Sequence, residues 1–242
     1  MILSAPLLRR IHKWIGLILG LQFMIWTVSG ATMALLDMET VAGGEARPAA
    51  AAPALPSGGS AWPEVRRSLG SQPITGLTVR PLLDRRVLEV ATPAGLRLFD
   101  AADGRPVQVD GLLARKVAGA AYSGGGKVSS VTRLGQLELA VREHKLPIWR
   151  VDFSDDANSS FYVSGETGKL LERRNDTWRI WDLAWMLHNM DYVNRTSFNH
   201  PLIVTVAFGI IWLAITGFWL LFRTKWMPDL RRLVRLRRGA KP

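Results

Sequence analysis

The stretch WIGLILGLQFMIWTVSGATMALL, residues 14–36, holds 23 consecutive residues without a charge. A second run, PLIVTVAFGIIWLAITGFWLLF at residues 201–222, holds 22 more. About 20 apolar residues in a helix cross the hydrocarbon core of a bilayer, and buried helices of soluble proteins seldom run uncharged for so long. The sequence therefore predicts two transmembrane helices, at residues 14–36 and 200–222.

The positive charge of the chain lies beside these two runs. The formal net charge is +11, and eleven basic residues with one acid flank the runs, whereas residues 37–200 hold 20 basic and 19 acidic residues. Basic residues next to a span favour its cytoplasmic side. We therefore expect cytoplasmic segments at residues 1–13 and 223–242, with the middle of the chain on the opposite face of the membrane.

The basic run from Arg231 to Arg238 is spaced as a helix lying beside the membrane. An anionic lipid surface accounts for such a helix, and the sequence contains no nucleic-acid-binding motif. Membrane lipid is the expected partner of this tail, and nucleic acid is not.

The chain contains no cysteine. This excludes disulfides, thiolate catalysis, iron–sulfur ligation and covalent haem attachment through a C-x-x-C-H motif. Motifs of hydrolases and of dinucleotide-binding enzymes are missing from the sequence as well. Any redox cofactor would have to be held by histidine.

The middle of the chain predicts a linker and two small α+β units. Residues 37–60 are rich in Ala, Pro, Gly and Ser and read as a flexible linker. Residues 61–108 and 109–175 each read as a helix followed by antiparallel strands, and aligning Gly104-Arg105 with Gly168-Lys169 superposes two turns. Helices are expected at 62–69 and 111–122, and strands at 74–80, 85–92, 96–100, 129–134, 137–142, 148–153, 160–163 and 170–173.

Three of the four histidines lie at a membrane boundary, and the first of them is His12. His12, Gly16 and Gly20 share one helix face, and the two glycines form a G-x-x-x-G pair that admits another helix or a flat ring. Two interpretations stay open. The face packs a dimer with His12 at headgroup level, or His12 is an axial ligand of a b-type haem.

Residues 176–199 predict an interfacial helix and a loop. Trp178, Trp181, Trp185 and His188 fall on one face of this helix. A neutral imidazole in such apolar surroundings needs a partner, for which haem iron would serve. His200 precedes Pro201, the first residue of the second span, and is either a second ligand or an interface residue. The fourth histidine, His144, reads as solvated and receives no role.

The membrane thickness separates these histidines. His12 lies about 30 Å from His188 and His200 if both spans cross fully, so they cannot ligate the same iron. A bis-histidine haem near His12 would need a second copy of the chain or a partner subunit. Haem binding therefore predicts a homodimer, built as a four-helix bundle.

Several segments together carry a family resemblance. They are Arg10-Ile11-His12-Lys13-Trp14-Ile15-Gly16-Leu17 with Thr27-Val28-Ser29-Gly30, the stretch from Leu146-Pro147-Ile148-Trp149 through Thr167-Gly168-Lys169 to Trp185-Met186-Leu187-His188, and Thr216-Gly217. In these segments the chain resembles PepSY-associated transmembrane proteins. The resemblance implies two transmembrane helices flanking a tandem PepSY-like domain of helices and antiparallel sheets, in a bacterial inner membrane, with the domain in the periplasm.

The better-understood members of this family are di-haem ferric-siderophore reductases. By analogy with them His12 and His188 are carried over as axial ligands of haem b, and a chelated ferric ion is the expected electron acceptor. Gly16, Gly20 and the tryptophan face that includes Trp185 would position the ring, with His200 as the further candidate ligand. Those reductases have four spans and this chain has two, and a homodimer would restore the helix count.

Two other functions remain open at the level of the sequence. One is a haem-free membrane anchor that carries a periplasmic PepSY binding or regulatory module. The other is a subunit of a larger membrane complex that supplies the missing ligands.

Overall fold

This computed structural model describes residues 5–44, 47, 54, 61–193, 195 and 197–228. It divides into two compact units, one formed by the N-terminal residues up to Leu35 together with Trp181 onward, the other by Leu36–Ile180. We name them the helical unit and the domain unit. The basic run expected at residues 231–238, and most of the linker expected at residues 37–60, lie outside the described residues.

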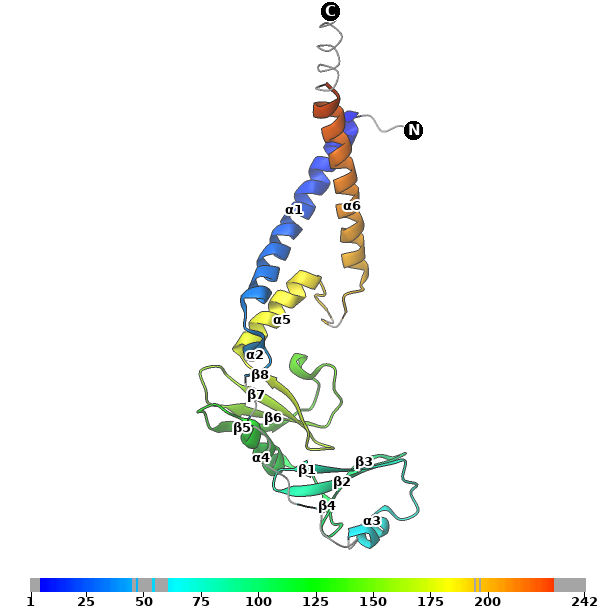
Figure 1. Cartoon of the computed structure of the whole chain (residues 1–242), viewed down its shortest axis with the longest axis vertical. Coiled ribbons are helices and arrows are strands. Elements are labelled where there is room, and N and C mark those ends of the chain that lie inside the picture. The colour runs from blue at the N-terminus through cyan, green and yellow to red at the C-terminus, as the bar shows by residue number, and fades with distance from the viewer. Residues whose placement is uncertain are drawn as a thin grey trace, which may run out of the picture. The chain divides into compact units, whose positions relative to one another are not determined.

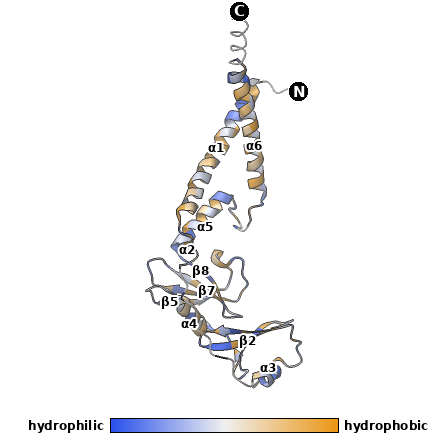
Figure 2. Ribbon diagram, in the orientation of Figure 1, coloured by the Kyte–Doolittle hydropathy of each residue, from blue (hydrophilic) through white to orange (hydrophobic). Residues whose placement is uncertain are grey.

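Two long apolar helices build the helical unit. They are α1 (Ala5–Leu35) and α6 (Pro201–Leu221), and α6 continues into a π-helical turn, η2 (Phe222–Trp226). Both are long and apolar enough to cross a membrane, and their hydrophobic residues stand out along both ribbons (Figure 2). The second helix has almost the predicted bounds, whereas α1 begins at Ala5, ahead of the predicted Trp14.

α1 and α6 pack against each other through small and aliphatic side chains. Leu19 of α1 and Val206 of α6 are buried in one cluster with Met190, and a Cβ added to Gly209 would lie 3.0 Å from Leu19 Cδ1. The outward faces are apolar as well, and each of Leu17, Ile18, Met24, Phe208 and Phe218 is at least 65% exposed. Exposed apolar faces on both helices suit contact with lipid.

The domain unit contains the same order of elements twice, namely a helix followed by four antiparallel strands. After the short helix α2 (Met38–Val41), α3 (Ala61–Leu69) precedes a sheet of order β1-β2-β3-β4, and α4 (Gly111–Ala121) precedes a sheet of order β5-β6-β7-β8 (Figure 1). The strands are Gly76–Leu82, Arg85–Thr92, Gly95–Asp100 and Pro106–Val107 in the first sheet, and Val128–Arg133, Ile148–Phe153, Ser160–Ser164 and Leu170–Arg174 in the second.

The last two strands of each sheet are joined by matching turns. Gly104 N–H donates to Asp100 O and Gly168 N–H donates to Ser164 O, at 2.9 and 2.8 Å. Both glycines have a positive φ, of 76° and 66°, which glycine adopts without a steric penalty. The two turns that the sequence alignment superposes are therefore the same structure.

Each sheet buries one face beneath its own helix. Val65 and Leu69 of α3 pack on Val90 and Phe99 of the first sheet. On the second sheet α4 contributes Ala114 and Ala118, and Tyr122 stacks on Phe153 with ring centroids 3.9 Å apart. Burial of these apolar side chains stabilises the packing of each helix on its sheet through the hydrophobic effect.

The strand expected at residues 137–142 does not form. Residues Leu139–Val141 make a 3₁₀ turn, η1, instead. This turn buries Val141 in a cluster with Leu134, Ile148 and Tyr162, and it places Glu138 to accept a hydrogen bond from Tyr162 Oη at 2.9 Å. The apolar residues of this segment cover the sheet rather than extend it. Their alternation along the sequence could not distinguish a strand from a 3₁₀ turn.

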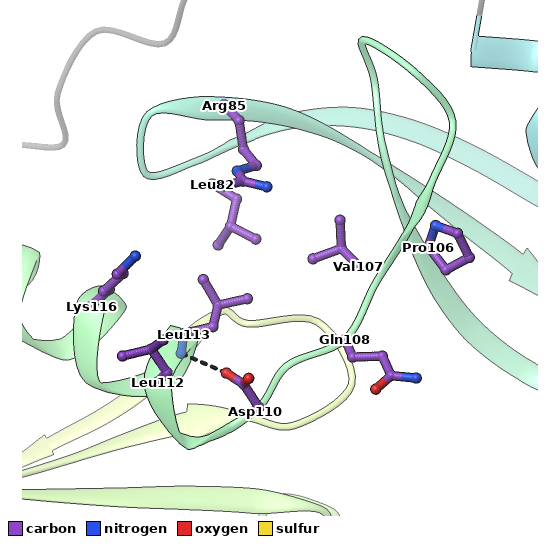
Figure 3. Close-up of a pocket in the computed structure, with 9 residues that line it drawn as sticks. All are labelled: Leu82, Arg85, Pro106, Val107, Gln108, Asp110, Leu112, Leu113 and Lys116. Carbon is purple, nitrogen blue, oxygen red and sulfur yellow. Dashed lines mark hydrogen bonds between the residues drawn. The ribbon is translucent and has the colours of Figure 1, made fainter.

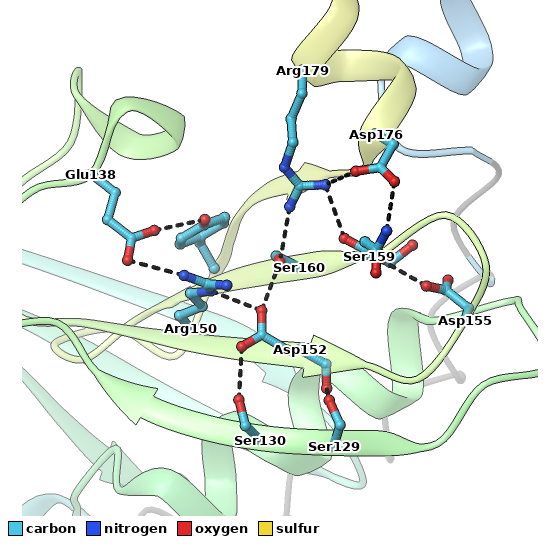
Figure 4. A network of polar contacts seen from close by, with 12 residues as sticks. Ser129, Ser130, Glu138, Arg150, Asp152, Asp155, Ser159, Ser160, Asp176 and Arg179 are labelled. Carbon is cyan, nitrogen blue, oxygen red and sulfur yellow. Dashed lines mark hydrogen bonds and ion pairs between the residues drawn. The ribbon is translucent and has the colours of Figure 1, made fainter.

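A polar network lies across the second sheet, centred on Asp152 of β6 (Figure 4). Its carboxylate accepts hydrogen bonds from Ser130 and Ser160, each at 2.7 Å, and pairs with Arg150 Nε at 2.7 Å. Burial alone would raise the pKa of Asp152, but these three donors outweigh it and hold the pKa below its ordinary value of 3.8. The ionised carboxylate therefore stabilises the sheet.

Asp152→Asn should reduce the stability of the domain unit at neutral pH and make it less sensitive to acid. The stabilisation is complete above about pH 4 and disappears as the pH falls through the lowered folded-state pKa. The thermal midpoints of wild type and variant are measured by circular dichroism. The difference between the two midpoints should narrow between about pH 4 and pH 2. Asp156→Asn at an exposed position is the control, and a gap that stays constant with pH would contradict the assignment.

Candidate functional site

His12 of α1 is held by a hydroxyl of α6. Its Nδ1 lies 2.8 Å from Thr216 Oγ1. The hydrogen of that hydroxyl is donated to Trp212 O, one turn earlier, also at 2.8 Å. With its hydrogen on Trp212 O, the hydroxyl oxygen can only accept from His12, which requires a proton on Nδ1.

His188 near the end of α5 (Asp176–Asn189) is held in the same way by α1. Its Nδ1 lies 3.2 Å from Ser29 Oγ, and Ser29 donates its own hydrogen to Ile25 O at 2.7 Å. Ser29 is 2% exposed, so this hydroxyl has exchanged water for these partners. Here too the oxygen accepts from Nδ1–H.

Both contacts suit an imidazole whose ring proton is on Nδ1. With the proton on Nδ1, the lone pair is on Nε2, and for neither ring does Nε2 have a hydrogen-bond partner among the described residues. A histidine that ligates a metal usually has this arrangement, in which one nitrogen binds and the other donates to a neighbouring oxygen.

A glycine and a tryptophan complete each constellation. A Cβ added to Gly217 would lie 3.3 Å from His12 Cε1, and one added to Gly30 would lie 3.1 Å from His188 Cε1. Trp212 lies 6.4 Å from the His12 ring and Trp26 lies 6.2 Å from the His188 ring, at interplanar angles of 37° and 39°. The helical unit thus repeats one arrangement of histidine, hydroxyl, glycine and tryptophan.

The two constellations are well separated along α1. Ser29 follows His12 by 17 positions, and an α-helix rises about 1.5 Å per residue, so the two hydrogen bonds are about 25 Å apart. They form two distinct sites, one where α1 begins and α6 ends and the other toward the opposite end of α1 (Figure 1).

Unpaired N–H donors lie around the His188 constellation. Among the described residues Gln22 Nε2, Trp26 Nε1 and Asn189 Nδ2 are buried without a hydrogen-bond partner. Gln22 is one turn before Trp26 on α1, Asn189 directly follows His188, and Asn189 is only 3% exposed. A buried donor without an acceptor costs about 1–3 kcal/mol, so this surrounding suits a ligand that brings acceptor oxygens.

The other residues named from the sequence lie apart from these constellations. His200 Nε2 bonds to Asn189 O at 2.7 Å, and Trp185 packs edge-on against Phe198 with ring centroids 5.5 Å apart. An added Cβ at Gly16 would only touch Leu213, at 3.9 Å, and one at Gly20 would meet nothing within 4 Å. His144 Nε2 pairs with Glu172 at 2.8 Å in the domain unit.

Sequence reasoning missed the partners of the two histidines. Ser29-Gly30 and Thr216-Gly217 are named from the sequence only as parts of a family resemblance, and neither pair is assigned a role there. The available signal was a repeated pattern, in which a tryptophan precedes a hydroxyl–glycine pair by three residues at Trp26 and by four at Trp212. Clusters of three or more acidic, histidine or cysteine side chains that could hold a metal ion are not found among the described residues.

Comparison of the chain with protein-family models, with curated proteins and with solved structures finds no match.

Thr216→Val should remove the Nδ1–H preference of His12 and leave that of His188, and Ser29→Ala should do the reverse. Each variant deletes one acceptor oxygen, so each is the control for the other. The tautomers can be measured from the ¹⁵N chemical shifts of labelled histidine in the purified membrane protein. Unchanged shifts at both rings in both variants would show that the hydroxyls do not orient them.

Proposed function

We propose that this protein is a haem b-binding electron-transfer protein of a bacterial inner membrane, acting as a homodimer in the reduction of a ferric chelate. The observation that carries the proposal is the repeated constellation in which a Ser or Thr hydroxyl lies against Nδ1, while Nε2 has no hydrogen-bond partner among the described residues. The chain has no cysteine, which excludes a thiolate ligand, and the histidines of the two constellations are the ligands that we propose for the haem iron.

The residues of the two constellations fit a haem. Nε2 of His12 and Nε2 of His188 would hold the haem iron, and Thr216 and Ser29 would orient the two rings. The unpaired donors of Gln22, Trp26 and Asn189 match the carboxylates that a haem carries. A bound haem would supply a one-electron ferric–ferrous couple, whose potential depends on its ligands and burial.

The count of imidazoles favours a dimer. Each constellation contains one histidine of this chain, His200 already uses its Nε2, and His144 belongs to the domain unit. A second copy related by a two-fold axis would bring a second imidazole to each site and would make a bundle of four helices. A partner subunit that supplies a ligand is the alternative to a second copy.

The positions of the basic residues suggest on which side of the membrane each constellation would lie. Arg9, Arg10 and Lys13 of α1 lie at the same end of the helical unit as Arg223 and Lys225, because His12 contacts Thr216. Basic residues favour the cytoplasmic side, so the His12 constellation would lie toward the cytoplasm and the His188 constellation toward the periplasm. One electron from a cytoplasmic-side reductant would then leave near His188 and reduce a chelated ferric ion to the ferrous state.

The resemblance to PepSY-associated transmembrane proteins supports the same acceptor, a ferric siderophore, and a PepSY-like identity for the domain unit. The two small helix-and-sheet units agree with that expectation in element order. This part of the proposal rests on analogy with the family.

Visible spectra of the detergent-purified protein from haem-replete cells test the proposal. Wild type should give a sharp b-type spectrum on reduction with dithionite, and His12→Ala and His188→Ala should each lose about half of the haem per chain. His200→Ala is the matched control and should keep the full amount, because its Nε2 is bonded to Asn189.

A colourless wild type would contradict haem binding and would leave a membrane-anchored binding module as the function. Loss of haem in His200→Ala but not in His188→Ala would contradict the ligand assignment.

A further inference from the structure

The domain unit contains a cavity of about 520 Å³ at the junction of its two helix-and-sheet units. Its walls come from the end of β1 and the turn that follows it, the second half of α4, and the turn between β7 and β8. The apolar part of the wall includes Leu83, Val117, Ala121 and Leu170. Pockets of this size, lined mainly by apolar side chains with a few polar groups, are typical of small-molecule sites.

Basic side chains line one side of this cavity. Arg80 Nε and Lys169 Nζ both pair with Glu89, at 2.8 and 3.1 Å. Burial alone would raise the pKa of Glu89, but the bonds from the two cations lower it, so Glu89 is ionised. Two cations share one carboxylate, which leaves a positive charge beside an apolar wall.

A third cation stands at the same cavity. Arg47 lines it, and the backbone N–H of Arg47 donates to Ala121 O at 3.1 Å, which fixes this residue at the end of α4. The one acidic residue among the lining residues is Asp84, which lies 3.7 Å from Arg85. The balance of charge around the cavity therefore favours an anion.

The backbone at Leu83 gives an independent indication of a binding site. Leu83 and Asp84 form the two-residue turn between β1 and β2, and Leu83 has a φ of 56°. The first position of such a turn normally holds glycine or asparagine, because a branched side chain is strained at positive φ. Here the strained position carries one of the apolar side chains of the cavity wall. Backbone strain of this kind clusters at binding and catalytic sites.

We propose that this cavity binds a small amphipathic carboxylate, whose apolar body lies against Leu83, Val117 and Leu170 and whose carboxylate lies against the half-exposed Lys169. The site is built from the domain unit alone and does not depend on haem. It differs in character from the neighbouring depression of about 290 Å³ at the start of α4, which is lined by Leu112, Lys116 and Asp110 (Figure 3).

The probe for this site is 4-(trifluoromethyl)phenylacetate, with its uncharged amide as the counterpart. The full chain is placed in nanodiscs of neutral lipid, empty nanodiscs are the blank, and binding is read from the ¹⁹F line width. The carboxylate should bind saturably and about tenfold more tightly than the amide, which is the size expected of a charge-assisted hydrogen bond. Lys169→Gln should remove most of that difference.

Substitutions on α4 locate the site. Ala120 is exposed and lines the cavity, so Ala120→Trp should fill it and abolish the broadening. Leu112→Trp is the matched control, because it adds the same side chain on the same helix beside the neighbouring depression. Equal binding by both variants, or no saturable broadening above the blank, would overturn the proposal.

Leu83→Asn separates a binding role from a structural one. Asparagine tolerates positive φ, so this variant should raise the thermal midpoint by about 3 °C while it weakens probe binding about threefold or more. A lower thermal midpoint with unchanged binding would show that Leu83 serves only the fold, and it would overturn its place in the site.

Discussion

Hydrogen bonds from two imidazole rings to two hydroxyls link the helices of the helical unit. His12 joins α1 to α6 and His188 joins α5 to α1, while most of the remaining contact surface is aliphatic. Polar side chains between packed helices are costly unless they find hydrogen-bond partners within the protein. These two bonds satisfy four such side chains, and they also decide which nitrogen of each ring is left available.

The repetition of this arrangement is informative because the two copies come from different helices. Packing alone would not require a tryptophan, a hydroxyl and a glycine beside each histidine. Gly30 and Gly217 leave so little room that even alanine would displace a ring atom. The same grouping of histidine, hydroxyl, glycine and tryptophan recurs about 25 Å away. One kind of ligand bound twice, as we propose, would account for this recurrence and for the unpaired donors of Trp26 and Asn189.

Most of the described part of the domain unit follows ordinary rules of sheet and turn chemistry. Its helices cover the sheets, its matching turns use glycine at positive φ, and its partly buried carboxylates Glu89 and Asp152 have partners. The turn at Leu83 departs from those rules, and it does so at a cavity with an excess of positive charge. A side chain that strains its own turn while it lines a cavity is typical of a binding site. The side chains of such a site are selected for a ligand as well as for the fold.

The sequence by itself determined the two apolar helices, the repeated helix-and-sheet order, most strand positions and the exclusion of cysteine chemistry. Those features depend on local composition and periodicity, which residues 14–36 and 201–222 show plainly. The sequence could not distinguish the 3₁₀ turn at Leu139–Val141 from a strand, because burial against the sheet determines the conformation of that segment.

Only the tertiary structure decided which partners the histidines have. His12 and Thr216 are 204 residues apart in the chain, and Ser29 and His188 are 159 apart, so no local pattern joins them. The cavity of the domain unit likewise combines residues from Arg47 to Leu170. Residue types could be read from the chain, but the tautomer of each imidazole and the charge around the cavity depend on contacts that exist only after folding.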